Sequence, residues 1–167
     1  MENVRRKILV MLDAMAPGAA AVQEAARLAQ GEAAYLELYD CGVGPQLPPG
    51  WADDGDSVAL YRELLHGRRL DDLERLARPL RSRGIDVTTC AEARTPLDEA
   101  IARHLDLASP DLILIDGLRE GGPAPWRTQA DGVLRHHACC PQGAGGRAGW
   151  RGGLWVGCPG YLKESQS

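Results

Sequence analysis

Short runs of aliphatic residues alternate with longer amphipathic stretches along most of this chain. Two of the runs, at residues 8–12 and 112–115, are uninterrupted, and each is followed by an aspartate, Asp13 or Asp116. Uninterrupted aliphatic runs of this length are typical of parallel strands that helices cover on both faces. The ligand crevice of an open α/β sheet lies beyond the carboxyl ends of its strands, so both aspartates are candidates for a binding site.

The amphipathic stretches have helical spacing. Between residues 57 and 83, Leu73, Ala77 and Leu80 recur on one face, and charged residues occupy the other. Gly31 and Gly84 stand where helices are expected to end. We predict strands over residues 7–12, 34–39, 85–90 and 111–115, and helices over residues 17–31, 57–83, 95–108 and 128–136.

This order of strands and helices requires parallel strands joined by right-handed crossovers. We therefore predict an α/β fold with a doubly wound, open, Rossmann-like sheet. The predicted domain covers residues 1–141. Residues 142–167 hold eight of the twenty glycines and little aliphatic bulk, so we expect this tail to be mostly flexible. Within the tail, residues 153–156 are a candidate edge strand.

Composition narrows the classes of partner. A net charge of −4 and a pI near 5.6 argue against nucleic acid or an anionic membrane. No apolar run approaches the roughly 20 residues of a membrane span, and residues 1–12 hold too little apolar sequence for a signal peptide. We expect a cytoplasmic protein. Its five cysteines, an odd number without framework spacing, are then expected to be reduced thiols.

Four stretches together resemble the universal stress protein family: residues 7–13, 83–87, 109–115 and 133–136. The resemblance spans residues 4 to 141. In that family the last helix leads into Cys-Pro-Val and a fifth strand, through which two subunits often pair. This chain follows the pattern to Cys140 and Pro141 and then enters the glycine-rich tail, which implies a degenerate or missing fifth strand. Either a shifted reading frame or a divergent end would explain the departure, and the coding DNA around Pro141 would distinguish them. We expect strand 111–115 to have an open edge that invites pairing.

Nucleotide-binding members of this family carry Gly-x-x-Gly after the fourth strand, then about nine residues, then Gly followed by Ser or Thr. Glycines let backbone amides approach the phosphates closely. Here the first two positions are Asp116 and Arg119, and the third is Gln129 or Arg127, depending on the register. Two negative charges about 4 Å apart repel by roughly 4 kcal/mol at an effective dielectric near 20. The resemblance therefore implies a degenerate nucleotide site, although Arg119 and Arg127 could hold phosphate by charge.

If a nucleotide does bind, the resemblance places its site at the ends of the first and fourth strands. Asp13 matches the family's acidic contact to adenosine; the alternative is an ordinary polar residue at a strand end. We expect no resident cofactor, with ATP or AMP as the alternative, and we predict no catalytic residue and no metal site. The candidate nucleotide-binding residues are Asp13, Asp40, Asp116, Gly117, Arg119, Arg127 and Thr128.

Other reactive side chains have simpler explanations. His136, His137, Cys139 and Cys140 are too close together in sequence to surround one tetrahedral ion, and basic residues are favoured at a helix end. His66 and His104 have no acid or nucleophile at a recognisable spacing, so we interpret both as surface or boundary residues.

The leading hypothesis is a stress-response protein that acts by binding or dimerisation and not by catalysis, as a homodimer and through protein partners. The alternative is an ATP or AMP binder, with slow hydrolysis, that uses Asp13 and residues 116–128. A third class is a thiol or metal module built on Cys139 and Cys140.

Overall fold

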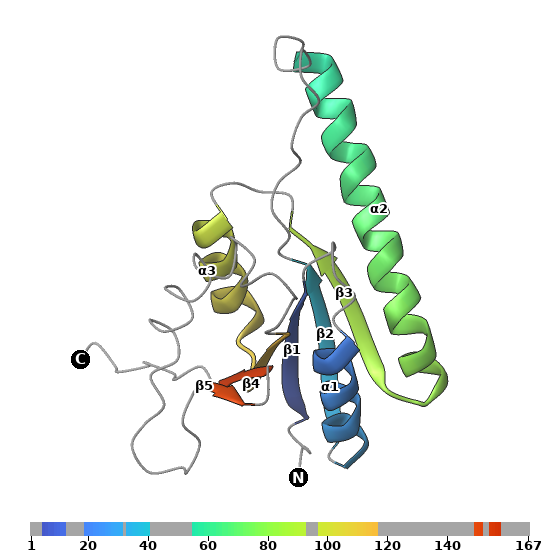
Figure 1. The fold of residues 1–167 in the computed structure, drawn as a ribbon, viewed down its shortest axis with the longest axis vertical. Helices are drawn as coiled ribbons and strands as arrows, with labels where there is room; N and C mark the ends of the chain where they lie inside the picture. Colours follow the sequence, from blue (N-terminus) through green and yellow to red (C-terminus); the bar gives the residue numbers. More distant parts are fainter. Residues whose placement is uncertain are drawn as a thin grey trace, which may run out of the picture.

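A computed structural model describes residues 5–12, 19–31, 33–40, 55–92, 97–116, 149–151 and 154–157. These residues form one sheet with helices on both of its faces (Figure 1). None of the described helices is both long and apolar enough to cross a membrane. The elements in chain order are β1 (Arg6–Leu12), α1 (Ala19–Gly31), β2 (Ala34–Asp40), α2 (Gly55–Ser82), β3 (Asp86–Ala91), α3 (Leu97–Ala108), β4 (Leu112–Asp116), β5 (Gly149–Arg151) and β6 (Leu154–Gly157).

The strand order is β3-β2-β1-β4-β6-β5. The first four strands pair in parallel, β1 with both β2 and β4, and β2 with β3. Chain connections run in one direction from β1 to β3 and in the other direction to β4, so α1 and α2 cover one face and α3 covers the other (Figure 1). The predicted doubly wound, Rossmann-like α/β fold is confirmed, and each predicted strand and helix inside the described ranges is present to within two residues.

Side chains alternate between the two faces along each strand. Ile8 and Val10 of β1, together with Leu36 and Leu38 of β2, belong to the core that α1 and α2 cover. From α2 this core receives Leu73, Ala77 and Leu80, the residues whose spacing predicted the helix. By the same alternation, Leu9 and Met11 of β1 and Glu37 and Tyr39 of β2 lie on the α3 face. Glu37, a charged residue inside β2, therefore faces α3.

The end of α2 is set by Gly84. This residue has a φ of +79°, a left-handed conformation that costs glycine little. Its N–H donates to the carbonyl of Arg81 (2.9 Å), and the N–H of Ile85 donates to the carbonyl of Leu80 (3.2 Å). This is the Schellman pattern, in which both bonds satisfy helix carbonyls that lack intrahelical partners. Leu80 and Ile85 are both buried, so the turn also directs the chain into β3.

Asp111 joins the beginnings of β1 and β4. Its carboxylate Oδ2 accepts a hydrogen bond from the N–H of Lys7 (2.7 Å), and its own N–H donates to the carbonyl of Lys7 (2.8 Å). The pair of bonds holds both strands in the register in which Ile8 lies beside Leu112. Both strands therefore end at the same edge of the sheet.

The tail contributes β6, which pairs antiparallel with β4 and places Trp155 beside Ile115. The predicted edge strand at residues 153–156 is confirmed, with a shift of one residue. The expectation of an open edge on β4 is wrong, because the backbone of β6 occupies that edge and β5 extends the sheet further. β6 thus lies beside β4, where the family resemblance places a fifth strand, and it is only four residues long.

The domain boundary at residue 141 stays a prediction, and the helix predicted at 128–136 lies outside the described residues.

Glu74 links α2 to β3 and leads to a prediction about pH. Hydrogen bonds from Arg81 (2.5 and 3.1 Å) and Thr89 (2.6 Å) reach its carboxylate, and they lower the pKa of Glu74 from 4.5 to about 2. Because the folded-state pKa is depressed, the stabilisation is complete above the unfolded-state value and is lost as pH falls toward 2. Glu74→Gln should reduce stability at neutral pH by less than about 1 kcal/mol, since the pair is half exposed. The difference from the parent chain should shrink on acidification.

Urea unfolding, followed by far-ultraviolet circular dichroism at neutral pH and at successively lower pH values, measures this difference. Glu63→Gln, at an exposed position on the same helix, is the matched control. A Glu74→Gln deficit that stays constant across the acid range would contradict the assignment of the depressed pKa to this carboxyl.

Candidate functional site

The topological switch point of the sheet lies between β1 and β4, because chain connections leave these adjacent strands in opposite directions. Ligands of doubly wound sheets bind in the crevice beyond the strand ends at this point. β1 ends at Leu12 and β4 ends at Asp116, and these neighbouring strands end at the same edge of the sheet. Only the backbone of Asp116 is described. The predicted residues outside the described ranges are Asp13, Gly117, Arg119, Arg127 and Thr128, and their roles stay predictions.

Asp40 ends β2, next to β1 at the same edge of the sheet. Its side chain is only 1% exposed and forms a two-pronged ion pair with Arg69 of α2: Nε donates to Oδ2 (3.0 Å), and Nη2 donates to Oδ1 (2.9 Å). Arg69 also donates from Nη1 to the carbonyl of Glu92, just after β3 (3.1 Å). The charge of Asp40 is therefore neutralised by a side chain that ties α2 to two strand ends. Its predicted part in ligand binding stays a prediction.

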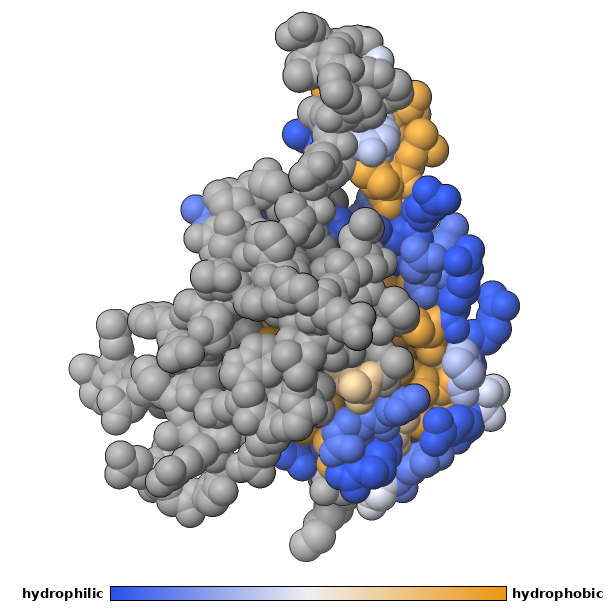
Figure 2. All heavy atoms as spheres, viewed as in Figure 1, coloured by the Kyte–Doolittle hydropathy of each residue, from blue (hydrophilic) through white to orange (hydrophobic). Residues whose placement is uncertain are grey.

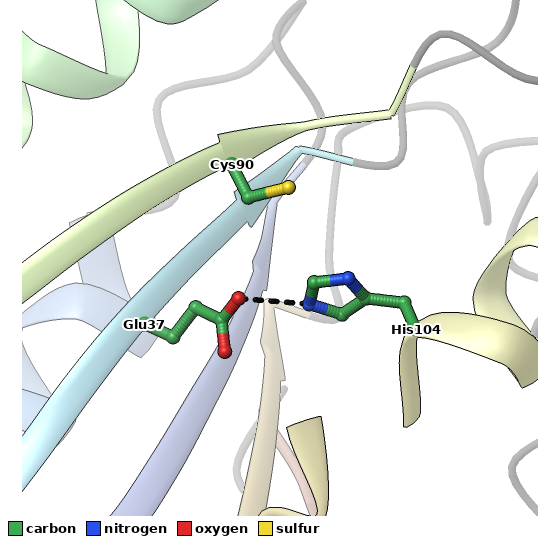
Figure 3. Close-up of side chains that lie close together, drawn as sticks. All are labelled: Glu37, Cys90 and His104. Atoms are coloured by element: carbon green, nitrogen blue, oxygen red, sulfur yellow. Dashed lines mark ion pairs between the residues drawn. The ribbon is translucent and has the colours of Figure 1, made fainter. Parts of the chain in front are cut away.

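A second group of polar side chains lies on the α3 face. Glu37 of β2, Cys90 of β3 and His104 of α3 point toward one another (Figure 3). One potential metal-ligand atom from each residue lies within 4.8 Å of the other two. The register places Glu37 beside Thr88 and Tyr39 beside Cys90, so Glu37 and Cys90 share a face on neighbouring strands. We call these three residues the Glu37 cluster.

The Glu37 cluster is partly shielded from solvent and carries strong electrostatic interactions. Glu37 is 8% exposed. Its Oε1 lies 2.9 Å from Nε2 of His104, and its Oε2 lies 3.1 Å from Nζ of Lys7. Burial by itself would raise the pKa of Glu37, but the adjacent His104 and Lys7 outweigh burial and hold this pKa below its ordinary value. Burial raises the pKa of the Cys90 thiol, and the nearby charges of Glu37 and Glu92 raise it further.

Two aromatic rings contact His104 and Lys7, the side chains that approach Glu37. The ring of Tyr39 stacks on the imidazole of His104, with centroids 4.0 Å apart and planes 12° apart. The hydroxyl of Tyr39 donates to Oε2 of Glu92 (3.1 Å). Nζ of Lys7 lies over the ring of Tyr35, 5.6 Å from its centroid. Both side chains that approach the carboxylate of Glu37, His104 and Lys7, therefore contact an aromatic ring.

Sequence reasoning missed this cluster, although His104 does lie at the boundary of the core as predicted. Two signals were present. Tyr35, Glu37 and Tyr39 alternate along a strand that helices cover on both faces, so a carboxylate there needs a partner. In α3, Ile101, His104 and Leu105 have helical spacing that puts the histidine on the apolar face. Cys90 carried no such signal; within the described residues it is a free thiol.

Comparison with known proteins identifies solved structures with a similar fold. No protein-family model and no curated protein matches the chain. Among solved structures, a universal stress protein family member from Burkholderia pseudomallei matches 81% of this chain and 91% of its own, with 28% identity and a TM-score of 0.50. A universal stress protein from Archaeoglobus fulgidus matches 80% of this chain and 88% of its own, with 14% identity and a TM-score of 0.43.

Proposed function

Because this chain belongs to the universal stress protein family by its structural likeness to the Burkholderia protein, we propose that it is a stress-response protein that acts by binding or dimerisation. The observation that carries the proposal is a match over 81% of this chain and 91% of the Burkholderia protein at 28% identity. We place its activity in the cytoplasm, with protein partners and without catalysis. Its nucleotide site is proposed to be degenerate.

The degenerate site follows from the end of β4. Asp116 is the last residue of this strand and lies next to β1, where the crevice of a doubly wound sheet opens. Family members that bind nucleotide have glycine at this position, where backbone amides meet phosphate. A carboxylate adds negative charge at that place, and Arg119 replaces the second glycine. Both substitutions oppose close approach of a triphosphate.

The alternative function is ATP or AMP binding at the same crevice, with slow hydrolysis. Arg119 and Arg127 favour it, because guanidinium groups bind phosphate oxygens strongly. In this alternative, Asp13 contacts the adenosine part, and Gly117 and Thr128 lie along the phosphates. The charges of Arg119 and Arg127 would then replace the backbone amides that contact phosphate in the glycine-rich motif.

A thermal-shift titration with ATP and Mg²⁺, and with AMP, tests the two functions. We expect no change in melting temperature at millimolar nucleotide. A binder with ligand at 100 times its Kd would gain about 2.7 kcal/mol, which is a shift of several degrees in a domain of this size. Such a shift would establish the alternative. The Burkholderia protein, as a structural relative, can be titrated in parallel under the same conditions.

Restoring glycine at the end of β4 is a gain-of-function test of the same proposal. Asp116→Gly with Arg119→Gly should increase ATP affinity at least tenfold and at most about a thousandfold, the limit set by removing roughly 4 kcal/mol of repulsion. The matched control, Asp116→Asn, removes the charge but keeps the side chain, so it separates repulsion from steric blocking. Isothermal titration calorimetry measures the affinities. Unchanged affinity in the double variant would mean that these two positions do not cause the degeneracy.

Homodimer formation is the other part of the proposal. The first half of α2 projects beyond the sheet (Figure 1), and Figure 2 shows apolar side chains on the projecting part. Leu60 and Leu64, one helical turn apart, are 58% and 64% exposed. A pair of exposed leucines on a projecting helix favours a protein contact. With β4 covered by β6, this surface replaces the strand edge as the expected contact.

Light scattering tests the dimer. We expect a mass of twice the 18.0 kDa chain for the parent protein and a monomer mass for Leu60→Glu with Leu64→Glu. Glu63→Ala, at an exposed position between the two leucines, is the control and should leave the mass unchanged. A monomeric parent protein would reject the homodimer, whereas a dimeric Leu60→Glu, Leu64→Glu variant would reject only this surface.

A further inference from the structure

Three different metal-ligand types from three different elements meet on the α3 face of the sheet. β2 supplies the carboxylate of Glu37, β3 supplies the thiol of Cys90, and α3 supplies the imidazole of His104 (Figure 3). We propose that these three side chains bind one Zn²⁺ ion, through a carboxylate oxygen, the thiolate sulfur and a ring nitrogen. The site is separate from the nucleotide crevice, because it lies on the face of β2 and β3 and not at the switch point between β1 and β4.

The donor set selects the metal. Zn²⁺ binds cysteine sulfur, histidine nitrogen and carboxylate oxygen, and sites with three protein ligands keep a fourth position for water or substrate. Mg²⁺ and Ca²⁺ prefer oxygen ligands, so a set in which two of three donors are sulfur and nitrogen disfavours both. A mixed set with one thiolate, one imidazole and one carboxylate suits a borderline-soft ion. Zinc is therefore the ion of choice for the Glu37 cluster.

The geometry needs only small side-chain movements. With zinc bonds of about 2.0–2.3 Å, two ligand atoms of a tetrahedral site stand roughly 3.3–3.7 Å apart. The three ligand atoms of the cluster already lie within 4.8 Å of one another. Nε2 of His104 and Oε1 of Glu37 are 2.9 Å apart and must separate by about half an ångström to admit the ion between them. Rotations about side-chain bonds suffice for such changes.

Two ligands are held in position by neighbours that do not themselves coordinate. Tyr39 stacks on the imidazole of His104 and fixes the plane of its ring. Lys7 contacts Oε2 of Glu37, which leaves Oε1 directed to His104. Residues that orient metal ligands in this way normally accompany a metal site. The pre-set orientation of a carboxylate and an imidazole lowers the entropy lost when an ion binds.

Two buried polar atoms of the cluster are incompletely satisfied. Among the described residues, neither Oε2 of Glu37 nor Nε2 of His104 has a well-directed hydrogen bond, although each has an ionic neighbour at close range. Buried polar atoms of native proteins rarely lack hydrogen bonds, and a bound ion can satisfy such atoms. The incomplete hydrogen bonding is at the ring nitrogen that zinc would bind. The incomplete hydrogen bonding is thus a separate observation from the types of ligand atom that the three side chains offer.

Two negative charges would face the ion. Zinc would add two positive charges, which Glu37 and a Cys90 thiolate offset, and Lys7 at the outer oxygen of Glu37 leaves the group with one net positive charge. On binding, the thiol proton leaves Cys90 for solvent and a sulfur–zinc bond forms in its place. No oxidant or reductant is needed. Without the metal, the raised pKa of Cys90 keeps this thiol protonated.

Zinc affinity of the purified full chain is the direct test. We expect one tightly bound Zn²⁺ per chain in competition with a chromophoric chelator. Loss of an outer-shell partner usually weakens metal binding 10- to 100-fold, so loss of a direct ligand should weaken it by about 100-fold or more. Cys90→Ser and His104→Gln should both show this loss. Their far-ultraviolet circular dichroism and melting temperature without metal should match those of the parent chain, which checks that each variant folds.

The four other cysteines require a matched control. A variant in which Cys90 is the only cysteine should keep the affinity of the parent chain; it carries serine at positions 41, 139, 140 and 158. Loaded with Co²⁺, this variant should show the intense visible bands of a tetrahedral ion and a thiolate-to-cobalt charge-transfer band, and Cys90→Ser should lack the latter. If zinc affinity disappears in the single-cysteine variant, or survives within about threefold in Cys90→Ser, the proposed site is wrong.

Discussion

Replacing Arg69 with methionine is expected to lower the free energy of unfolding by about 3–5 kcal/mol, because the variant removes the guanidinium group that pairs with both oxygens of a buried carboxylate. Asp40 is 1% exposed, and both of its oxygens accept hydrogen bonds from the guanidinium group. The same side chain also holds the carbonyl of Glu92. Methionine keeps much of the apolar stem but supplies no donor. Urea unfolding, followed by circular dichroism, measures the loss.

The matched control is Arg75→Met on the same helix. Arg75 forms an exposed pair with Asp72 (2.8 Å), and such pairs contribute at most about 1 kcal/mol. A second variant, Asp40→Leu with Arg69→Met, removes both charges. It should recover most of the stability lost in Arg69→Met, since an apolar pair of similar volume replaces a buried ion pair at little cost. If Arg69→Met is no more destabilising than Arg75→Met, Asp40 is not a buried charge that depends on Arg69.

Replacing Leu38 with alanine should lower the free energy of unfolding by about 2–5 kcal/mol. Leu38 is fully buried in β2, in the core that α1 and α2 cover. Truncation removes apolar contacts and leaves a cavity between the sheet and two helices, which cannot close without moving a central strand. Chemical unfolding at constant pH measures the change in midpoint and slope.

Leu107→Ala is the matched substitution at an exposed site. Leu107 is 79% exposed on α3, so the same truncation there should change stability by no more than about 0.5 kcal/mol. A large effect at Leu107 with a small effect at Leu38 would reverse the assignment of the core. Together, the two leucines compare the same truncation at a buried and at an exposed position.

The Asp40–Arg69 pair and the Glu37 cluster occupy opposite faces of β2 and have different consequences. The ion pair is closed, since the carboxylate of Asp40 is matched by a guanidinium group of the right shape. In the Glu37 cluster, three different types of potential metal ligand meet, and two buried atoms lack well-directed hydrogen bonds. The first arrangement is suited to stability, whereas the second brings three potential metal-ligand atoms together. Residues of one strand can therefore serve two separate purposes.

Much of the fold could be predicted from local patterns. The uninterrupted aliphatic runs of β1 and β4 and the spacing of Leu73, Ala77 and Leu80 in α2 each follow from the period of one element. The order of these elements then requires a parallel, doubly wound sheet. Even β6 was visible as a short apolar segment, but its antiparallel pairing with β4 was not. Strand direction at an edge depends on the path of the chain before it, which residue spacing does not encode.

By itself, the sequence determined the elements, their order, the family resemblance and the residues that replace the nucleotide-binding glycines. Only the tertiary structure decided that Asp40 meets Arg69, and that Glu37, Cys90 and His104 meet one another although they are far apart in the chain. The physical reason is that periodicity reports which face a residue occupies within its own element. Which residues share that face across different elements depends on strand register and helix packing, and these arise only when the whole core forms.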